Sequence, residues 1–354
     1  MDEKSLLVER GVKEFNVTLW GVGLETDGDM IFFRNKTLSF DFGSANTVVR
    51  KDGDVVFDEP TLVAYTRYGE AVVGSKALLM REVPYARYGK PIINGYVADF
   101  ESYEQYVKGV VKSIIAFPRF LKSYSVIIAV PDDLQGEESA MSVRAFSDPF
   151  FEMGFKNIKF IHQSVAATKG LGLPENKYHL IVDIGYGKTR ASLVKDSLVV
   201  KTKLWSSVSG KTWISDIVDH LHTEHQLRIG EVTAKHLLLS VATADEEVND
   251  MPDPLSFGAP GVCDCRPHKV TIDNKELAKV LNPNLLLFEK ELDGFIKEEI
   301  MTISEEVREG IISEGVWLIG GCSLLRGLSD RLERSLNLSI HIPADPRFVI
   351  SGGL

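Results

Sequence analysis

Short apolar runs bounded by glycine, asparagine or aspartate recur along the chain, and each such run predicts a β-strand. The first group covers residues 37–65, where Asp52-Gly53-Asp54 supplies a hairpin turn. A second group begins near residue 180 and turns at Asp196-Ser197. The pattern therefore predicts two strand meanders, one in each half of the chain.

Apolar residues at intervals of three and four predict helices between and after the two meanders. The expected helices cover residues 101–115, 164–170, 213–226, 232–241, 274–281, 285–309 and 324–336. Continuous apolar runs predict buried strands at residues 125–130, 159–161 and 316–319. Residues 66–90 are more polar and rich in tyrosine, which favours a small inserted subdomain.

Prolines mark two further stretches of the chain. Residues 136–153 have helical character, but Asp148-Pro149 is expected to interrupt this helix, because proline lacks the N–H donor and clashes with the preceding turn. Residues 245–268 contain four prolines and little periodicity. This composition predicts a long surface loop.

The length and composition indicate a soluble globular protein of two domains or of one deeply divided domain. The chain has 354 residues, 44% of them hydrophobic and 25% charged. Its net charge of −10 argues against a nucleic-acid partner, which would need a basic surface. No apolar stretch reaches the roughly 18 residues that span a bilayer, and residues 1–36 carry charges in place of a signal-peptide core. We therefore expect a cytoplasmic protein.

The three cysteines, Cys263, Cys265 and Cys322, fit a reducing compartment. One candidate metal site consists of Cys263-Asp264-Cys265 together with His268. A fourth ligand is not evident, and the C-x-C spacing is too tight for an ordinary structural zinc site. No metal is expected there.

A short turn sequence occurs twice and carries the most specific chemistry in the chain. Asp41–Thr47 and Asp183–Thr189 share the pattern Asp-apolar-Gly-x-small-x-Thr, each between two apolar runs. Small residues in such a turn let backbone N–H groups approach phosphate oxygens, and the aspartate suits a hydrated Mg²⁺. The copies lie roughly 140 residues apart, about one domain length. A duplicated unit with one phosphate turn in each half is expected.

A third glycine-rich segment, Gly320–Ser323, follows the apolar run at residues 316–319. Its two glycines leave room for a planar base or a ribose close to the backbone. The two Asp-Gly turns and the Gly-Gly segment follow one another along the chain in this order. With this arrangement the chain resembles the superfamily of actins, sugar kinases and heat-shock chaperone ATPases. Within it, the chain is similar to the MreB-type bacterial actins through five stretches: Asp41–Thr47, Phe57–Thr61, Asn94–Glu101, Gly170–Pro174 and Leu324–Leu328.

The resemblance covers nearly everything except the N-terminal extension, residues 1–36. It implies an α/β, actin-like ATPase fold, with two RNase H-like domains around a nucleotide cleft and a small subdomain on each. Domain I would comprise residues 37–175, with its small subdomain at about 66–90, and residues 331–354 would return to it. Domain II would comprise residues 176–330, with its small subdomain at about 209–269.

The resemblance also implies ATP or ADP with Mg²⁺ as cofactors. Asp41 and Asp183 would hold Mg²⁺ through water, and Glu138 would orient the attacking water. The alternative for Glu138 is a solvated carboxylate at a helix start. The remaining nucleotide-binding residues implied by the motif positions are Gly43, Ser44, Ala45, Asn46, Thr47, Gly185, Tyr186, Gly187, Lys188, Thr233, Ala234, Lys235, His236, Gly320, Gly321, Cys322 and Ser323.

The second phosphate turn departs from the family pattern. Tyr186, Lys188 and Arg190 stand where the family has Gly, Thr and Glu, and Lys235 replaces an acidic residue near the ribose. A lysine beside the γ-phosphate would strengthen binding by ion pairing. The loss of the Thr hydroxyl and the Glu carboxylate removes groups that would position water, so we expect weak or slow hydrolysis.

Relatives of this type polymerise head to tail, so the resemblance implies filaments of this chain and other actin homologues as further partners. Residues Phe117–Leu121 match the family's membrane-dipping loop, and their basic neighbours suit an anionic inner membrane surface. The alternative for this loop is a helix end packed on its own domain. The alternative functions are a non-polymerising pseudo-ATPase that regulates another actin homologue, and a sugar or acetate kinase.

Overall fold

The computed structural model describes residues 36–80, 83, 85–115, 124–136 and 139–354. The chain divides into two units, Met1–Asn35 and Lys36–Leu354, and all described residues belong to the second. Three sequence predictions therefore lie outside the described residues: the N-terminal extension up to residue 35, the apolar loop Phe117–Leu121, and Glu138.

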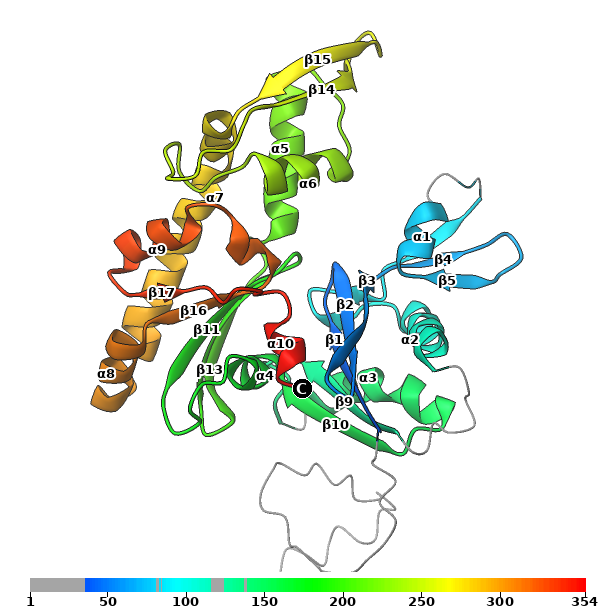
Figure 1. The fold of residues 1–354 in the computed structure, drawn as a ribbon, viewed down its shortest axis with the longest axis vertical. Coiled ribbons are helices and arrows are strands. Elements are labelled where there is room, and N and C mark those ends of the chain that lie inside the picture. The colour runs from blue at the N-terminus through cyan, green and yellow to red at the C-terminus, as the bar shows by residue number, and fades with distance from the viewer. Residues whose placement is uncertain (1–35, 81–82, 84, 116–123, 137–138) are drawn as a thin grey trace, which may run out of the picture. The chain divides into compact units, whose positions relative to one another are not determined.

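A five-stranded sheet forms the centre of the first half, with strand order β10-β9-β1-β2-β3 (Figure 1). Its antiparallel meander consists of β1 (Lys36–Phe42), β2 (Asn46–Lys51) and β3 (Asp54–Pro60). On the other side of β1, the parallel strands are β9 (Tyr124–Val130) and β10 (Asn157–His162). The predicted strands at 125–130 and 159–161 are thus confirmed.

The second half repeats this sheet strand for strand, in the order β13-β12-β11-β16-β17. Its meander consists of β11 (His179–Ile184), β12 (Thr189–Lys195) and β13 (Leu198–Trp205). The parallel strands are β16 (Val316–Ile319) and β17 (Ile340–His341). The shared topology confirms the expected duplication of an α/β unit.

Helices α2 (Phe100–Ile114) and α3 (Ala140–Met153) belong to the core of the first half. An aromatic cluster joins them to β1, with Phe42 edge-on to Tyr103 and Phe40 edge-on to Phe150. All four side chains are at most 1% exposed. Each such ring buries roughly 150–250 Å², so this cluster fixes the helices on the sheet.

The second half has a larger core built on five helices and a short π-helix. They are α5 (Gly210–Thr223), α6 (Glu231–Ser240), α7 (Asn274–Gly294), the π-helix Phe295–Ile300, α8 (Glu305–Glu314) and α9 (Leu328–Leu336). A single 3₁₀ turn, Gly321–Leu324, precedes α9. The predicted helix at 324–336 therefore begins four residues later than expected.

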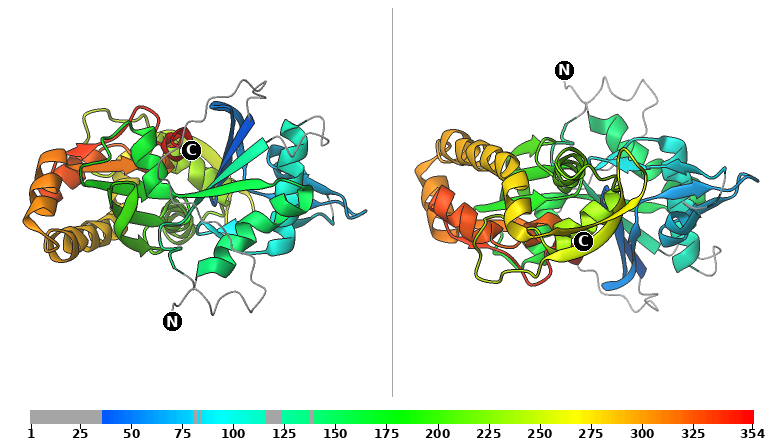
Figure 2. Two further views of the ribbon diagram at one scale, coloured as in Figure 1. Left: turned by 90° about the horizontal axis from the view of Figure 1, so that it is seen from below. Right: turned by 90° about the horizontal axis from the view of Figure 1, so that it is seen from above.

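A third, smaller core joins the two halves. It contains alanines of α4 (Gln163–Gly170), Ala129 of the first sheet, Ile181 of the second sheet, and Ile350 of α10 (Val349–Gly352). A Cβ on Gly353 would lie 1.8 Å from the Ala166 carbonyl oxygen, so the C-terminal segment packs backbone to backbone on α4. In both views of Figure 2, the orange helix α8 lies at one end and the blue strands between residues 63 and 73 lie at the other.

Of the C-terminal residues that the sequence assigns to domain I, α9 and β17 pack and pair with the second sheet. Only α10 contacts α4, β1 and β2. The small elements of the first half are β4 (Val63–Tyr65), β5 (Ala71–Val73), α1 (Ser75–Leu79), β6 (Arg87–Gly89), β7 (Ile92–Ile93) and β8 (Tyr96–Val97). Strand β4 pairs with β5 and β6, so the first meander ends at Pro60.

Three sequence predictions about stretches that contain proline are wrong. Pro149 lies inside α3, and Pro283 lies inside α7, which runs without the expected break at 282–284. In α7 the buried residues Leu277, Leu281, Leu285 and Phe288 form one continuous apolar face, and burying that face outweighs one lost hydrogen bond. The break comes instead between Ile300 and Glu305.

The expected loop at 245–268 contains β14 (Leu255–Pro260), which pairs with β15 (Pro267–Ile272). Both strands are edge strands of a two-stranded sheet. A proline is tolerated in an edge strand because its missing N–H donor is not needed for pairing with a further strand. Pro260 and Pro267 are partners at the turn end of this hairpin. Among the helices of the described residues, none is long and apolar enough to cross a membrane.

Candidate functional site

The two Asp-Gly turns have the same backbone geometry. The Gly43 N–H donates to the Asn46 carbonyl at 3.0 Å, and the Gly185 N–H donates to the Lys188 carbonyl at 3.0 Å. A Cβ on Gly43 would lie 2.5 Å from the carbonyl oxygen of Asn46, which leaves no space for a side chain. The shared pattern found in the sequence therefore describes a real structural repeat.

Buried threonines brace both turns from behind. The Thr47 hydroxyl lies 2.9 Å from that of Thr61, which donates to the Gly43 carbonyl at 2.6 Å. The Thr189 hydroxyl donates to the Val208 carbonyl at 2.8 Å. Thr47 and Thr189 are both fully buried. Thr47 therefore supports its turn from behind.

The tips of the two turns meet across the two halves of the molecule. A Cβ on Gly187 would lie 2.9 Å from Asn94 Oδ1 and 3.0 Å from Ser44 Oγ. The Ser44 hydroxyl also accepts a hydrogen bond of 3.2 Å from the Gly95 N–H. Any side chain at position 187 would fill the small space between the turns.

Asp41 and Asp183 lie at the ends of the two strands that lead into the turns. Burial and, to a smaller extent, the charge of Asp183 raise the pKa of Asp41 to about 7, against an opposing hydrogen bond from Gln163. Burial also raises the pKa of Asp183, against the opposing charges of Arg190 and Lys188. Two desolvated carboxylates that repel one another are an oxygen-donor set suited to a hard divalent cation.

Lys188 projects from the second turn into the first half. Its side chain is buried, and Nζ has no hydrogen-bond partner among the described residues. The ammonium lies 4.6 Å from the centre of the Tyr96 ring, and a Cβ on Gly95 would be 2.7 Å from it. Burial, with a smaller contribution from Arg190, lowers the pKa of Lys188 to about 7. An unpartnered buried amine at this position suits an anionic ligand.

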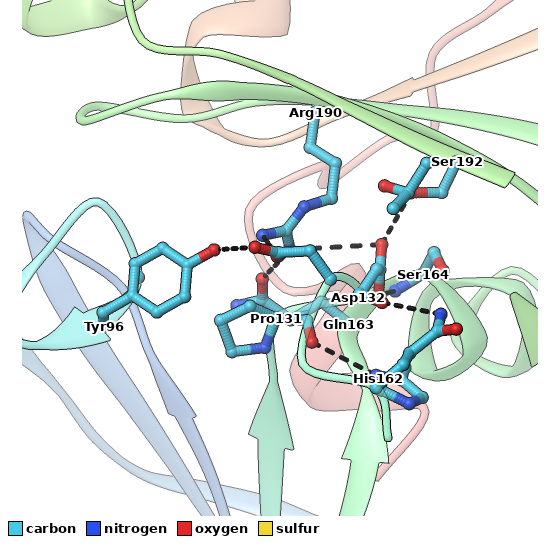
Figure 3. A network of polar contacts seen from close by, with 12 residues as sticks. Tyr96, Pro131, Asp132, His162, Gln163, Ser164, Arg190 and Ser192 are labelled. Atoms are coloured by element: carbon cyan, nitrogen blue, oxygen red, sulfur yellow. Dashed lines mark hydrogen bonds and ion pairs between the residues drawn. The ribbon is translucent and has the colours of Figure 1, made fainter. Parts of the chain in front are cut away.

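Arg190 follows on the same strand and joins a polar network that the sequence analysis did not find (Figure 3). Its guanidinium donates to Gln163 Oε1 at 2.7 Å and to Asp133 Oδ1 at 2.8 Å. The Tyr96 hydroxyl donates to the other oxygen of Asp133. Arg190 belongs to the second half and its partners to the first, so the network links the halves.

Asp132 forms the inner part of this network. It is 1% exposed, and its carboxylate accepts from the Ser164 N–H at 3.0 Å and from the Ser192 hydroxyl at 2.6 Å. The signal available in the sequence was the pair of aspartates directly after Val130-Pro131, where a buried strand ends. Their distant partners gave no sequence signal.

The Gly320–Ser323 turn packs against the second aspartate. Gly320 has a φ of +85°, and a Cβ there would lie 2.3 Å from Asp183 Oδ1, so glycine is required. Ser323 is fully buried and donates to the Gly320 carbonyl at 2.8 Å, which makes it a brace of the turn. Burial raises the pKa of the Cys322 thiol to about 12, so this cysteine stays protonated.

The predicted ribose-side residues lie on α6 and face different ways. Ala234 is fully buried in the core, whereas Lys235 and His236 are exposed and Thr233 is half-buried. The Lys235 charge acts on the Cys322 thiol, which places the lysine near the Gly320–Ser323 turn. The structure thus brings the three glycine turns and Lys235 together, and it places Thr47, Ala234 and Ser323 inside the protein.

A comparison with protein-family models matches residues 35–354 of the chain to the family described as MreB/Mbl protein. Among curated proteins, the chain is similar to the cell shape-determining protein Mbl of Bacillus subtilis (strain 168). The two are 24% identical over 325 residues, which cover 90% of this chain and 94% of the relative.

Solved structures with the same fold include MreB5 of Spiroplasma citri bound to AMPPNP, with a TM-score of 0.80 and 21% identity over 90% of this chain and 95% of that one. A second is the MamK double helical filament, with a TM-score of 0.71 and 18% identity over 90% of this chain and 97% of that one. These likenesses confirm the predicted actin-like α/β fold.

The raised pKa of Asp41 predicts a pH-dependent stability in metal-free and nucleotide-free protein. The folded protein holds a proton that the unfolded chain releases, so stability falls as the pH rises from the ordinary aspartate pKa of 3.8 towards about 7. Asp41→Asn removes this loss, and its melting temperature should exceed that of the wild type by more at pH 7 than at pH 5. Thermal unfolding in EDTA measures the difference. The exposed carboxyl variant Asp54→Asn is the control, and an equal gain at both pH values would contradict the assignment.

Proposed function

The chain belongs to the MreB/Mbl protein family, and we propose that it is a cytoskeletal protein that binds ATP with Mg²⁺ and polymerises into membrane-associated filaments. One observation carries the nucleotide part of this proposal. Two turns of the same build, each beside a buried aspartate, meet tip to tip across the two halves of the molecule.

The residues present fit a triphosphate and its metal. Ser44, Ala45 and Asn46 would contact the outer phosphates from the proposed domain I, residues 37–175, and Gly185–Gly187 would do so from the proposed domain II, residues 176–330. The Gly187 position supports this placement, because a Cβ there would fill the space between the turns. The structures of MreB5 bound to AMPPNP and to ADP belong to a protein of the same fold and support nucleotide binding.

Asp41 and Asp183 would hold Mg²⁺ through water, and the bound ion would neutralise phosphate charge. Lys188 would add a direct ion pair, since its buried amine lacks a hydrogen-bond partner among the described residues. Gly320, Gly321, Cys322 and Lys235 would face the nucleoside.

Weak or slow hydrolysis follows from the polar groups around the second turn. An arginine has no acceptor atom, so Arg190 cannot take a proton from water, and two of its nitrogens already donate to Gln163 and Asp133. Both oxygens of Asp132 also accept hydrogen bonds. Glu138, the predicted water-orienting residue, lies outside the described residues and stays a prediction.

Filament assembly is proposed from the family and from the MamK structure, which is that of a double helical filament. The proposed partners are further copies of this chain and other actin homologues. We propose a cytoplasmic protein that lies peripherally at the inner membrane face, with Phe117–Leu121 as the contact. The alternative is a pseudo-ATPase that regulates another actin homologue and does not polymerise.

Replacing Lys188 by methionine should weaken ATP binding while leaving the apo protein folded. The loss of one charged hydrogen bond to phosphate corresponds to about a 10- to 100-fold weaker affinity. The apo protein should melt at the same or a higher temperature, because a buried unpartnered amine is removed. Calorimetric titration with ATP measures the affinity, and Lys195→Met, at the far end of β12, is the matched control. Equal ATP affinity of Lys188→Met and wild type would contradict the assigned role.

Phosphate release should be slow even when ATP saturates the protein. Loss of a positioned water-orienting group reduces a rate by roughly 10²-fold or more. The expected rate is therefore on the order of 10²-fold below that of an ATP-hydrolysing family member measured in the same buffer. A coupled phosphate-release assay at a nucleotide concentration well above the measured dissociation constant tests this. Release at the speed of the reference protein would exclude a hydrolysis defect.

Assembly should require nucleotide but not its cleavage. Electron microscopy and pelleting of the purified chain with ATP, with a non-hydrolysable analogue and without nucleotide should show filaments in the first two conditions. Flotation of the same samples with anionic vesicles tests membrane attachment. A chain that stays monomeric in all three conditions, yet enters filaments of a second actin homologue, would favour the regulatory alternative.

A further inference from the structure

Three side chains converge at one point of the second half, away from the glycine turns. His220 lies in the last turn of α5, His225 follows that helix, and Glu276 lies in the first turn of α7. The Nε2 atoms of His220 and His225 lie 2.7 and 2.5 Å from the same oxygen, Glu276 Oε1. The three potential ligand atoms all lie within 4.8 Å of one another. Among the described residues, this is the group of histidine and carboxylate side chains whose spacing could hold a metal ion.

The backbone holds both ends of this cluster in place. The Leu227 N–H donates to the Leu221 carbonyl at 3.0 Å, and both leucines are buried, so the segment after α5 folds back and directs His225 towards His220. Gln226, between them, has a φ of +53°. On α7, the Asp273 carboxylate caps the helix by accepting from the Glu276 N–H at 2.9 Å. Side chains carried on such fixed elements need little ordering to bind a ligand.

We propose that His220, His225 and Glu276 bind a divalent transition metal ion of the zinc class. Two imidazole nitrogens and one carboxylate oxygen are the ligands that Zn²⁺, Co²⁺ and Ni²⁺ prefer, whereas Mg²⁺ and Ca²⁺ prefer oxygen alone. Tetrahedral binding at about 2.0–2.2 Å places neighbouring donors about 3.3 Å apart. Each imidazole therefore has to withdraw from Glu276 Oε1 by less than about 1 Å. Water would complete the fourth position.

Partial burial keeps the site open to an incoming ion. The side chains of His220, His225 and Glu276 are 22%, 29% and 26% exposed. A bound ion would fasten the end of α5 to the start of α7. The site is independent of the nucleotide proposal, since none of its residues belongs to the three glycine turns.

The other combination of metal-ligand residue types lies on the β14–β15 hairpin and does not form such a cluster. His268 contacts both oxygens of Asp264 at 3.0 and 2.9 Å, and Cys263 and Cys265 are exposed. Among the described residues these thiols do not gather with a third ligand. The thiols would still bind zinc weakly in a titration, so the experiment has to remove them.

The test is calorimetric titration of the full chain with Zn²⁺, without nucleotide and with Mg²⁺ in excess, in a Cys263→Ser/Cys265→Ser background. We expect one zinc ion per chain and a higher melting temperature in its presence. His225→Gln should weaken the affinity at least about tenfold and abolish the thermal shift. His222→Gln, which removes an exposed histidine of the same helix, should change neither.

Titration with Co²⁺ provides a second measurement that does not depend on stability. Visible absorption typical of nitrogen and oxygen ligands should appear in the parent protein and in His222→Gln, and should be lost in His220→Gln and Glu276→Gln. Melting curves in EDTA identify any variant that is misfolded. The proposal is overturned if the parent chain binds no zinc, or if His222→Gln loses as much affinity as His225→Gln.

Discussion

The buried guanidinium of Arg190 is the interaction on which the meeting of the two halves depends. Arg190 is 3% exposed, and its hydrogen-bond partners Asp133 and Gln163 come from the other half. A charge removed from water is tolerated only with partners that replace its hydration. The network therefore holds β12 against the end of β9 and the start of α4, and this places the second turn beside the first. The apolar packing of α4 and α10 between the sheets supports the same arrangement from below.

The charges around this interaction do not balance within the protein. Two cationic groups, Lys188 and Arg190, lie among four carboxylates: Asp41, Asp132, Asp133 and Asp183. Asp132 and Asp133 accept hydrogen bonds in the network, whereas the charge of Asp183 disfavours ionisation of Asp41, and the charges of Arg190 and Lys188 partly stabilise Asp183. The excess negative charge is thus concentrated at the ends of β1 and β11. This is the position where a divalent cation would relieve the repulsion, while the lysine offers the counter-charge for an anion.

The sequence predicted the strands and helices well because burial there follows a simple period. It failed at Pro149 and Pro283, where a continuous apolar face outweighs the loss of one helical hydrogen bond. The positions of the site motifs were also predictable, because the Asp-Gly turn constrains its own backbone. The direction of each side chain was not. Ser323 was predicted at the ligand but faces inward, and the partners of Arg190 are distant in the sequence, so only tertiary packing brings them together.

The pKa values of Asp41 and Lys188 are shifted in opposite directions, towards the same pH. Burial raises the pKa of Asp41 to about 7 and lowers that of Lys188 to about 7, so desolvation disfavours the charged form of each group. A divalent cation would draw the proton from the carboxyl, and a phosphate would draw a proton onto the amine, because each favours the charged form of its neighbour. The proton released by one group is therefore balanced by the proton taken up by the other. If metal and phosphate arrived together, both groups would become charged with little net exchange of protons, whereas either ligand alone would leave the other group without an ionic partner. A metal and a phosphate that bind together would therefore offset the desolvation of both groups.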